Sequence, residues 1–407
     1  MCPDIFFNKS GFHNHIAHHL CTIYSLNASP SIIQKQYDHN KEYQRSPVPV
    51  DADVIDNLHE PSQFHKYLGN ERYYHDYLKF FSSEIDKKGY RNVINEYLFA
   101  RDDRADDMLT RLFAGFLHPI IHLGFGVEFQ QPAIVAEGLA QAAVHDNWMR
   151  PLFIGAEQTA AKNPNQPSKT LMQLLKEAKS KPELREAAAS TDSNRIRDGL
   201  LAKQAQTMID IVAQYKVGAK DIDRASAEMT NVCAFFTGGA QRPTKQVKMD
   251  FYYMHCINCS IFFDPFMHAD WLSTENKVRL LEWKGRNAVT MYASRGSPDL
   301  LLDEIRNYKP KIPSKNASDP WKDIIDRVCK FEDDGHGSKL VRALAHGQRI
   351  CRPYEDREEF PLKHADWLQL GHMTIDSVEA PDGIHWIRSA GFDEAWKDVP
   401  DRPKAQL

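Results

Sequence analysis

Apolar residues recur every three or four positions along most of this chain, and charged residues fill the positions between them. This spacing predicts amphipathic helices. The clearest examples lie in residues 133–149, 169–189, 193–217 and 273–295. A succession of short alternating strands is absent from the pattern, and only residues 382–392 indicate β pairing, at the periphery. The pattern therefore predicts an all-α fold.

Clusters of proline, asparagine and serine interrupt the helical blocks at four places. They predict long surface loops near residues 44–62, 162–170, 308–320 and 352–364. None of these clusters is long enough to link two independent domains, and no internal repeat is visible. We therefore expect residues 1–407 to form a single large multi-helical domain with long surface loops.

Composition excludes several classes of function. The 407 residues are 42% hydrophobic and 26% charged, which is an ordinary globular balance, and the formal net charge of −4 favours neither nucleic acid nor an anionic membrane. No apolar run reaches the roughly 18 residues that a membrane helix needs. The first residues also lack the basic region and apolar core of a secretory signal. We expect a cytoplasmic protein with no nucleic-acid partner and no membrane contact; the oligomeric state is left open.

The seven cysteines are an odd number and favour reduced thiols over a disulfide framework. Cys256 and Cys259 have C-x-x-C spacing, but the chain has no second such pair to complete a structural zinc site. A haem attachment would need histidine where Ser260 stands. We expect two buried thiols one helical turn apart.

Histidine is the residue type that suggests chemistry. His118 and His122 lie four residues apart in an almost wholly apolar segment, 112–129. Three further groups are His13, His15, His18 and His19 in residues 12–26, His255 in residues 250–263, and His336 with Lys339 in residues 332–344. A buried imidazole needs a partner for both nitrogens, so each ring either bonds within the fold or binds something else. Pro119 disfavours helical geometry at His118, so the two rings of the first pair need not align.

Two interpretations of these histidines stay open. A single H-x-x-x-H pair is more often part of a core than of a metal site. Four groups together favour a metal, because one shared cation offsets the desolvation of all of them. Imidazoles suit zinc, copper, iron or nickel, and Asp333, Asp334 and Glu128 could add a carboxylate. Neither the H-E-x-x-H motif of zincins nor the Glu-x-x-His pairs of ferritin-like di-iron proteins are present in these segments.

Lys339 has three possible roles. It could ligate a metal as a neutral amine, or react with carbon dioxide to give an anionic carbamate ligand, if burial removes its charge. It could instead pair with Asp333 or Asp334 on a surface turn, which is the interpretation that the residues alone favour.

Six segments, in this order, resemble marker segments of the questin oxidase family. They are residues 13–29, 115–129, 250–263, 280–301, 333–344 and 386–400. The resemblance implies an oxidoreductase of fungal secondary metabolism. It implies that the enzyme cleaves a C–C bond of an anthraquinone-like aromatic polyketide with O2, formally as a Baeyer–Villiger ring opening. Asn27 stands where the family is expected to have glycine, which affects only a turn.

The resemblance also implies a non-haem iron centre, Fe(II), built from histidines and one lysine. The metal ligands predicted in this way are His15, His19, His118, His122, His255, His336 and Lys339, and His18 belongs to the same family set. Of these, His122, His336 and Lys339 are predicted to be catalytic. The resemblance leaves NADPH open as a reductant. No flavin is expected, because the chain has no G-x-G-x-x-G turn.

Aromatic residues near the histidines could wall a flat substrate pocket. They are Phe113, Phe116, Phe125, Phe251, Tyr252 and Tyr253. Packing in the core is the commoner role for such residues.

Two other functions compete with the oxidase. One is a helical metal-dependent hydrolase of the HD type, suggested by His145 and Asp146. The other is a helical scaffold without catalysis, in which the histidines only bridge helices.

Overall fold

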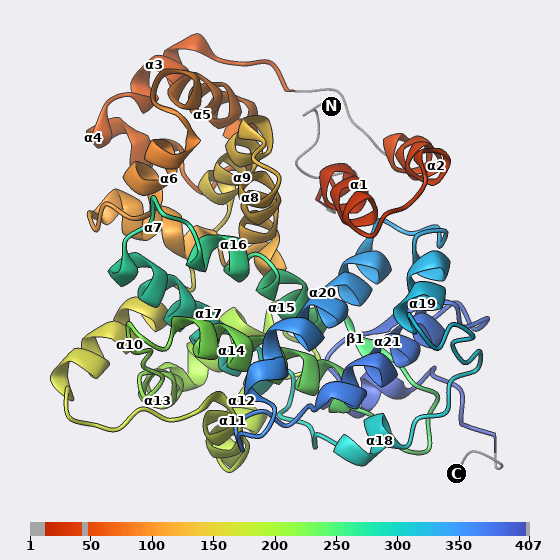
Figure 1. Cartoon of the computed structure of the whole chain (residues 1–407). Helices are drawn as coiled ribbons and strands as arrows, with labels where there is room; N and C mark the ends of the chain where they lie inside the picture. The colour runs from red at the N-terminus through yellow and green to blue at the C-terminus, as the bar shows by residue number, and fades with distance from the viewer. Residues whose placement is uncertain (1–12, 43–47, 404–407) are drawn as a thin grey trace. The chain divides into compact units, whose positions relative to one another are not determined.

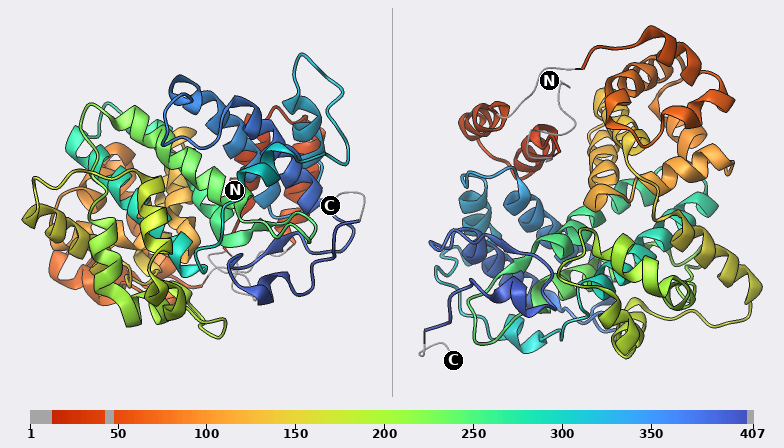
Figure 2. Two further views of the ribbon diagram at one scale, coloured as in Figure 1. Left: turned by 90° about the horizontal axis from the view of Figure 1, so that it is seen from below. Right: turned by 180° about the vertical axis from the view of Figure 1, so that it is seen from behind.

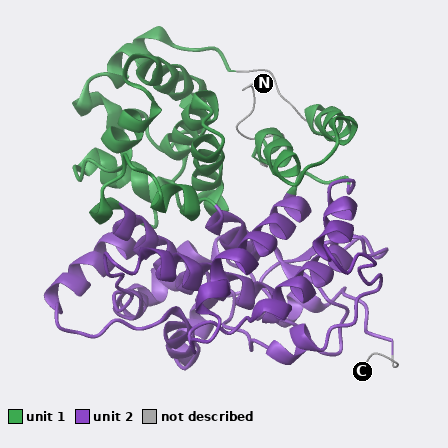
Figure 3. Ribbon diagram, in the orientation of Figure 1, with its two compact units in different colours: residues 1–150, 262–276, 332–335 green, residues 151–261, 277–331, 336–407 purple. Residues whose placement is uncertain are grey.

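The computed structural model describes residues 13–42 and 48–403, and these residues are predominantly helical (Figure 1). Their contacts group into two compact units, each assembled from segments that alternate along the chain (Figure 3). Unit 1 comprises residues 1–150, 262–276 and 332–335, and unit 2 comprises residues 151–261, 277–331 and 336–407. The predicted all-α class is confirmed. The single domain predicted over residues 1–407 stays a prediction.

Unit 1 holds the first helices of the chain and one later helix. Its elements are α1 (Ile16–Ser25), α2 (Pro30–Lys41), α3 (Ala52–Leu58), α4 (Pro61–Phe64), η1 (His65–Tyr67), η2 (Glu71–Tyr73), α5 (Tyr74–Lys88), α6 (Tyr90–Leu98), α7 (Asp103–Arg111), η3 (Gly115–Leu117), α8 (His118–Glu128), α9 (Pro132–Val144) and α16 (Phe263–Met267).

Unit 2 holds the remaining elements, although α10 and α17 begin in the last residues of unit 1 segments. They are α10 (Arg150–Lys162), α11 (Leu171–Lys179), α12 (Pro182–Ala187), η4 (Arg195–Leu201), α13 (Ala202–Val212), α14 (Ile222–Gly239), β1 (Met249–Asp250), α15 (Phe251–Ser260), α17 (Thr274–Ser294), α18 (Leu302–Arg306), α19 (Trp321–Val328), α20 (His336–Cys351), η5 (Arg352–Tyr354), α21 (His364–Val378), β2 (Trp386–Ile387) and η6 (Asp393–Trp396).

Helices α8 and α9 lie side by side in the core of unit 1 (Figures 1 and 2). Residues 118–127 of α8 and residues 134–144 of α9 are buried on every side. Helices that are apolar all round belong in the interior of a protein. Beside them, the rings of Phe64, Tyr77, Phe80, Phe81 and Tyr97 contact one another as a second apolar cluster. The polar side chains of α8 and α9 are therefore held by a rigid core.

Gly138 sets how closely α8 and α9 approach. A Cβ atom at Gly138 would lie 2.6 Å from the backbone nitrogen of Leu123 and 2.8 Å from its Cα. Backbone atoms of a buried helix cannot yield, so we expect Gly138→Ala to lower the free energy of unfolding by about 2–3 kcal/mol. Urea denaturation measures this loss. Gly155→Ala is the control, because its new methyl group meets only the Ile209 side chain, at 2.9 Å from Cδ1; equal losses in the two variants would contradict the prediction.

Unit 2 is built on α14 and α17, which are buried along most of their length. The ring of Phe153 stacks on Trp283 of α17 with centroids 4.5 Å apart. Helices α20 and α21 pack against each other (Figures 1 and 2). Strands β1 and β2 form one short parallel pair, and the side chain of Asp250 at its end accepts from the backbone N–H groups of Tyr252 and Tyr253, which fixes the start of α15.

The predicted helices are present, with breaks at identifiable residues. Residues 133–149 contain α9, and residues 273–295 contain α17, whose start is capped by Ser273 Oγ accepting from Asn276 N at 3.3 Å. Residues 169–189 split into α11 and α12, because Pro182 occupies the first turn of a new helix. Residues 193–217 begin as the π-helical turn η4 before α13. The β pairing expected in residues 382–392 is β2.

The predicted loop near residues 44–62 is wrong in its second half. That stretch contains α3 and α4, while residues 43–47 lie outside the described residues. The Asp51 side chain accepts from Asp53 N at 3.1 Å and caps α3, and Pro61 occupies the first turn of α4. The proline and aspartate read as loop signals are therefore helix starts. The loops near 162–170, 308–320 and 352–364 are confirmed, apart from the short helical ends within them.

Cys256 and Cys259 lie one turn apart in α15 with no exposed surface, as expected. Burial raises the pKa of the Cys256 thiol far above its ordinary value, and raises the pKa of Cys259 to about 12. Both thiols are therefore protonated at neutral pH and are poor metal ligands. The six cysteines within residues 13–42 and 48–403 are all unbridged.

No single helix of the described part of the chain is long and apolar enough to cross a membrane. Asp103–Arg111 and Gly115–Glu128 meet those criteria of length and composition only as a pair, with a bend of 69° between them.

Candidate metal centre

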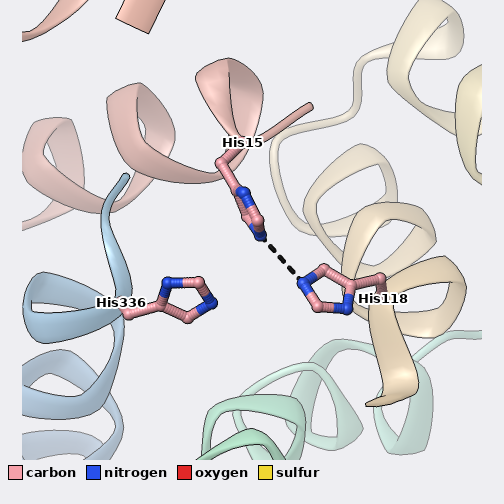
Figure 4. Close-up of side chains that lie close together, drawn as sticks. All are labelled: His15, His118 and His336. Carbon is pink, nitrogen blue, oxygen red and sulfur yellow. Dashed lines mark hydrogen bonds between the residues drawn. The ribbon is translucent and has the colours of Figure 1, made fainter. Parts of the chain in front are cut away.

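Two of the predicted histidine groups meet in unit 1, where α1 packs against α8. His15 is the residue before α1, and His118 is the first residue of α8. Their Nε2 atoms face each other at 2.8 Å (Figure 4). One turn further along both helices, His18 Nε2 lies 3.0 Å from His122 Nδ1. The fold therefore pairs, ring to ring, histidines that lie about a hundred residues apart in the sequence.

A left-handed turn leads the chain into α8. Gly115, Phe116 and Leu117 have φ angles of 51°, 55° and 69°, and the turn brings the Gly115 carbonyl within 2.6 Å of His118 Nδ1. Pro119 follows in the first turn of α8, where its missing N–H has no partner to lose. The expectation that Pro119 disturbs His118 is wrong, because His118 has helical angles of φ −60° and ψ −42°.

The outer nitrogens of His15 and His118 fix which ring nitrogen carries the proton. His118 Nδ1 donates to the Gly115 carbonyl, which can only accept. His15 Nδ1 lies 3.3 Å from a carboxylate oxygen of Asp334, which also accepts. A neutral ring in either position therefore carries its hydrogen on Nδ1 and presents a lone pair at Nε2. A partner at the outer nitrogen that fixes the tautomer is the usual environment of a metal-binding histidine.

Two facing lone pairs 2.8 Å apart repel each other unless a positive charge lies between them, which either a shared proton or a metal ion supplies. The side chains are only 2–3% exposed, so water does not screen the repulsion. Two nitrogens bound at right angles to one ion, each at about 2.0–2.1 Å, lie about 2.9 Å apart. The separation of the two Nε2 atoms therefore fits a pair of neighbouring ligands on one metal ion.

His122 is held by α9 on both of its nitrogens. Nε2 donates to Glu137 Oε2 at 2.8 Å, and Nδ1 accepts from the Gln141 amide at 3.0 Å. Both partners were missed in the sequence, although a signal was present. Glu137 and Gln141 stand four residues apart in an otherwise apolar, alanine-rich helix, so they share one face of it.

Three more histidines surround these pairs. His19 Nδ1 lies 3.1 Å from the amide nitrogen of Asn40 in α2, so this predicted ligand has a protein partner on that side. His13 stacks on His118 with ring centroids 4.1 Å apart, and His13 Nε2 lies 2.9 Å from His145 Nε2. His145, which suggested a hydrolase, is thus part of the histidine cluster of unit 1.

The other predicted ligands lie in unit 2. His255 Nδ1 donates to the Phe251 carbonyl at 2.6 Å, so its Nε2 is also bare, and that atom lies 3.3 Å from His336 Nε2. His336 is the first residue of α20 and is drawn in Figure 4. Lys339 lies one turn further along α20 and is 3% exposed. The surface location predicted for Lys339 is therefore wrong, while its pairing with Asp333 or Asp334 stays a prediction.

The last segment of unit 1, residues 332–335, packs on the start of α1. Asp334, which pairs with His15, belongs to the unit 1 segment that ends at Gly335. A Cβ at Gly335 would lie 2.8 Å from Cβ of His19. The backbone that leads into His336 thus packs closely on the start of α1.

Most of the aromatic residues near the histidines pack in the core. Phe113, Phe125, Phe251 and Tyr253 are at most 9% exposed. Phe116 is 39% exposed. Packing therefore accounts for these four residues, whereas Phe116 is partly exposed.

His145 makes the stability of the protein depend on pH. Burial, and then the positive charge of Arg111, lower the pKa of His145 from 6.5 to about 3. Between these two values the unfolded chain binds a proton at His145 and the native protein does not, so stability falls as the pH falls, by up to about 1.4 kcal/mol per pH unit. Urea denaturation at pH 7, 6 and 5 measures the slope. We expect His145→Gln to flatten it; equal slopes in the two proteins would contradict this source of acid sensitivity.

These features define a class of protein: a helical protein with buried histidines paired ring to ring, whose imidazole nitrogens are of the kind that bind transition metals. Comparison with known proteins gives the family. Residues 12–344 match the model of the questin oxidase-like family, and the chain belongs to that family. It is therefore an oxidoreductase of the questin oxidase type.

Curated relatives match along nearly the whole chain. A Baeyer–Villiger oxidase of Pestalotiopsis fici is 39% identical over 402 residues, which cover 97% of this chain and 90% of the relative. A Baeyer–Villiger monooxygenase of a Cryptosporiopsis species is 40% identical over 405 residues, covering 97% and 90%. A questin oxidase of Aspergillus terreus is 38% identical over 400 residues, covering 97% and 89%.

Proposed function

We propose that this protein opens a ring of an anthraquinone-like aromatic polyketide with O2, by a formal Baeyer–Villiger oxidation at a histidine-bound iron. The observation that carries the proposal is the pair of bare Nε2 atoms of His15 and His118, 2.8 Å apart in a nearly dry site. The names of the relatives, Baeyer–Villiger oxidase and questin oxidase, support the reaction.

In this proposal His15 and His118 are metal ligands, each oriented through Nδ1. His255, His336 and Lys339 are further ligands, as the family resemblance implies. His19 and His122 were also predicted as ligands. The bonds of His122 to Glu137 and Gln141 favour a different role for it. When bound, Fe(II) supplies the redox chemistry that lets O2 react with an organic substrate.

His18, His122 and Glu137 form a chain that can hold a proton. His18 Nε2 lies 3.0 Å from His122 Nδ1, and His122 Nε2 donates to Glu137 at 2.8 Å. A proton taken from a phenol of the substrate by His18 can pass to His122 Nδ1. The Glu137 carboxylate then stabilises the imidazolium, as a buried acid does in other acid–base sites. In this proposal His122 takes part in catalysis by accepting and holding the proton that leaves the substrate.

NADPH is the proposed reductant. Insertion of one oxygen atom beside a carbonyl leaves the second atom of O2 to be reduced to water, which takes two electrons and two protons. NADPH and one proton supply them. The word monooxygenase in the name of one relative agrees with this balance.

An isotope experiment tests the proposal. The purified protein, loaded with Fe(II), is incubated with an anthraquinone, NADPH and ¹⁸O2, and the mass of the product is measured by mass spectrometry. We expect ring-opened product with one ¹⁸O atom from O2 and one NADPH oxidised per turnover. Product that forms equally well without oxygen, or no oxygen uptake with any planar polyketide quinone, would refute the proposal and favour a hydrolase or a scaffold.

A further inference from the structure

The turn before α8 contains a second feature, at Phe116. Its backbone lies in the left-handed region, with φ 55° and ψ 40°, and Leu117 follows at φ 69°. This region favours glycine, and it disfavours side chains that are bulky near the backbone. Gly115, which precedes them, is the one glycine of the turn, and a Cβ there would lie 2.2 Å from His145 Nε2.

Stability alone does not account for a phenylalanine at this position. The Leu117 side chain has no exposed surface, so its burial offsets its backbone strain. Phe116 is 39% exposed, whereas the neighbouring Phe113 is 3% exposed. A large apolar side chain that is strained and only partly buried stabilises the fold less than glycine or asparagine could at the same angles. Strained residues of this kind concentrate at ligand-binding sites.

The position of Phe116 indicates which kind of molecule its side chain binds. It lies two residues before His118, and the carbonyl of Gly115 in the same turn orients His118. The turn therefore fixes a metal ligand and an aromatic ring together. A flat polycyclic substrate offers large π-faces, which aromatic side chains bind by offset stacking.

We propose that Phe116 is a substrate-binding residue whose ring stacks on the planar aromatic system of the substrate beside His118. This proposal rests on the proposed function and adds a specificity determinant to it. The left-handed backbone holds the ring in position before the substrate arrives, which lowers the entropy lost on binding.

Binding of 1,8-dihydroxyanthraquinone without oxygen tests the proposal, with tryptophan fluorescence quenching of the full-length, metal-loaded protein as the readout. We expect Phe116→Ala and Phe116→Gly to raise the Kd of this probe about tenfold or more, and Phe116→Tyr to keep it within about twofold, since loss of an aromatic stack costs that much. Tyr24→Ala is the matched control, because it removes an aromatic ring that is 66% exposed in the same unit. It should leave the Kd unchanged.

Thermal unfolding tests the strain separately. In an ordinary helix alanine is more stable than glycine, but at a left-handed position the order reverses. We expect Phe116→Gly to melt about 1 °C above Phe116→Ala, since relief of strain at one left-handed residue shifts the Tm of a chain of 407 residues by about that much. The reverse order would overturn the claim that the turn is strained.

The outcomes separate this proposal from the proposed function. Equal Kd values for the probe in the wild type and in Phe116→Ala overturn the stacking role alone. The stacking role is also overturned if the wild type binds metal and consumes O2 with a substrate, and Phe116→Ala has the same KM for that substrate. Wild-type protein that does not bind the probe at all removes the planar substrate class on which both proposals depend.

Discussion

Replacement of His118 by alanine is expected to remove the bound metal and, with it, oxidative turnover. The variant leaves the Nε2 atom of His15 without the facing nitrogen at 2.8 Å, so one of the two oriented ligands of the centre is lost. We expect the iron content to fall to less than about a tenth of the wild-type value and kcat to fall by about a thousandfold or more, because the metal carries the redox step. Elemental analysis and oxygen uptake measure the two effects.

Controls separate loss of the ligand from loss of the fold. His118→Gln keeps a side-chain N–H that can donate to Gly115, and should lose metal while keeping the helical circular dichroism of the wild type. His268→Ala removes an imidazole from α16's end in the same unit, where the side chain is 65% exposed. We expect that control to keep its iron and activity. A His118→Ala protein with full iron content would remove His118 from the centre.

Replacement of Glu137 by glutamine is expected to lower kcat by about a hundredfold or more while the metal stays bound. The amide oxygen of glutamine can still accept from His122 Nε2, so the ring keeps its orientation. The negative charge that stabilises a protonated His122 is lost, which removes general acid–base catalysis worth about 10²–10⁴ in rate. Steady-state kinetics and iron analysis on the same preparation measure both quantities.

The pH profile distinguishes a proton carrier from a purely structural acid. If Glu137 supports a proton on His122, the acidic limb of the kcat profile, where the accepting base becomes protonated, should move to lower pH in the variant as the rate falls. Glu96→Gln is the matched control, because Glu96 is a partly exposed acid of unit 1 that pairs with Lys88 at 2.8 Å. Unchanged kcat in Glu137→Gln would contradict the proton chain from His18 to Glu137.

The sequence predicts the fold class well because helix signals are local. The three- and four-residue periodicity of residues 133–149 and 273–295 is sufficient to place α9 and α17. The break between α11 and α12 at Pro182 is also local, but it is masked by the apolar periodicity around it. Residues 52–62 were predicted as part of a loop because aspartate and proline mark both turns and helix starts. Only the surrounding packing decides between those two roles.

The histidine pairs could be anticipated as residue types but not as partners. Nothing local in the sequence pairs His15 with His118 rather than with His122, because that choice depends on how α1 packs across α8. The tautomers depend on Gly115 and Asp334, which reach the rings only in the folded chain. Glu137 was within reach of sequence reasoning as a single acid in an apolar helix. The left-handed angles of Phe116 and Leu117 could not be predicted from the sequence, since neither residue type favours them.

The central claim is that the bare Nε2 atoms of His15 and His118 share one redox-active ion. Iron K-edge X-ray absorption on the purified protein, with its metal content measured in parallel, tests it most directly. We predict about one iron per chain with a first shell that contains at least two imidazole nitrogens at about 2.0–2.2 Å, and loss of imidazole scattering in His15→Ala. A metal-free protein that still consumes oxygen with its substrate would contradict the claim.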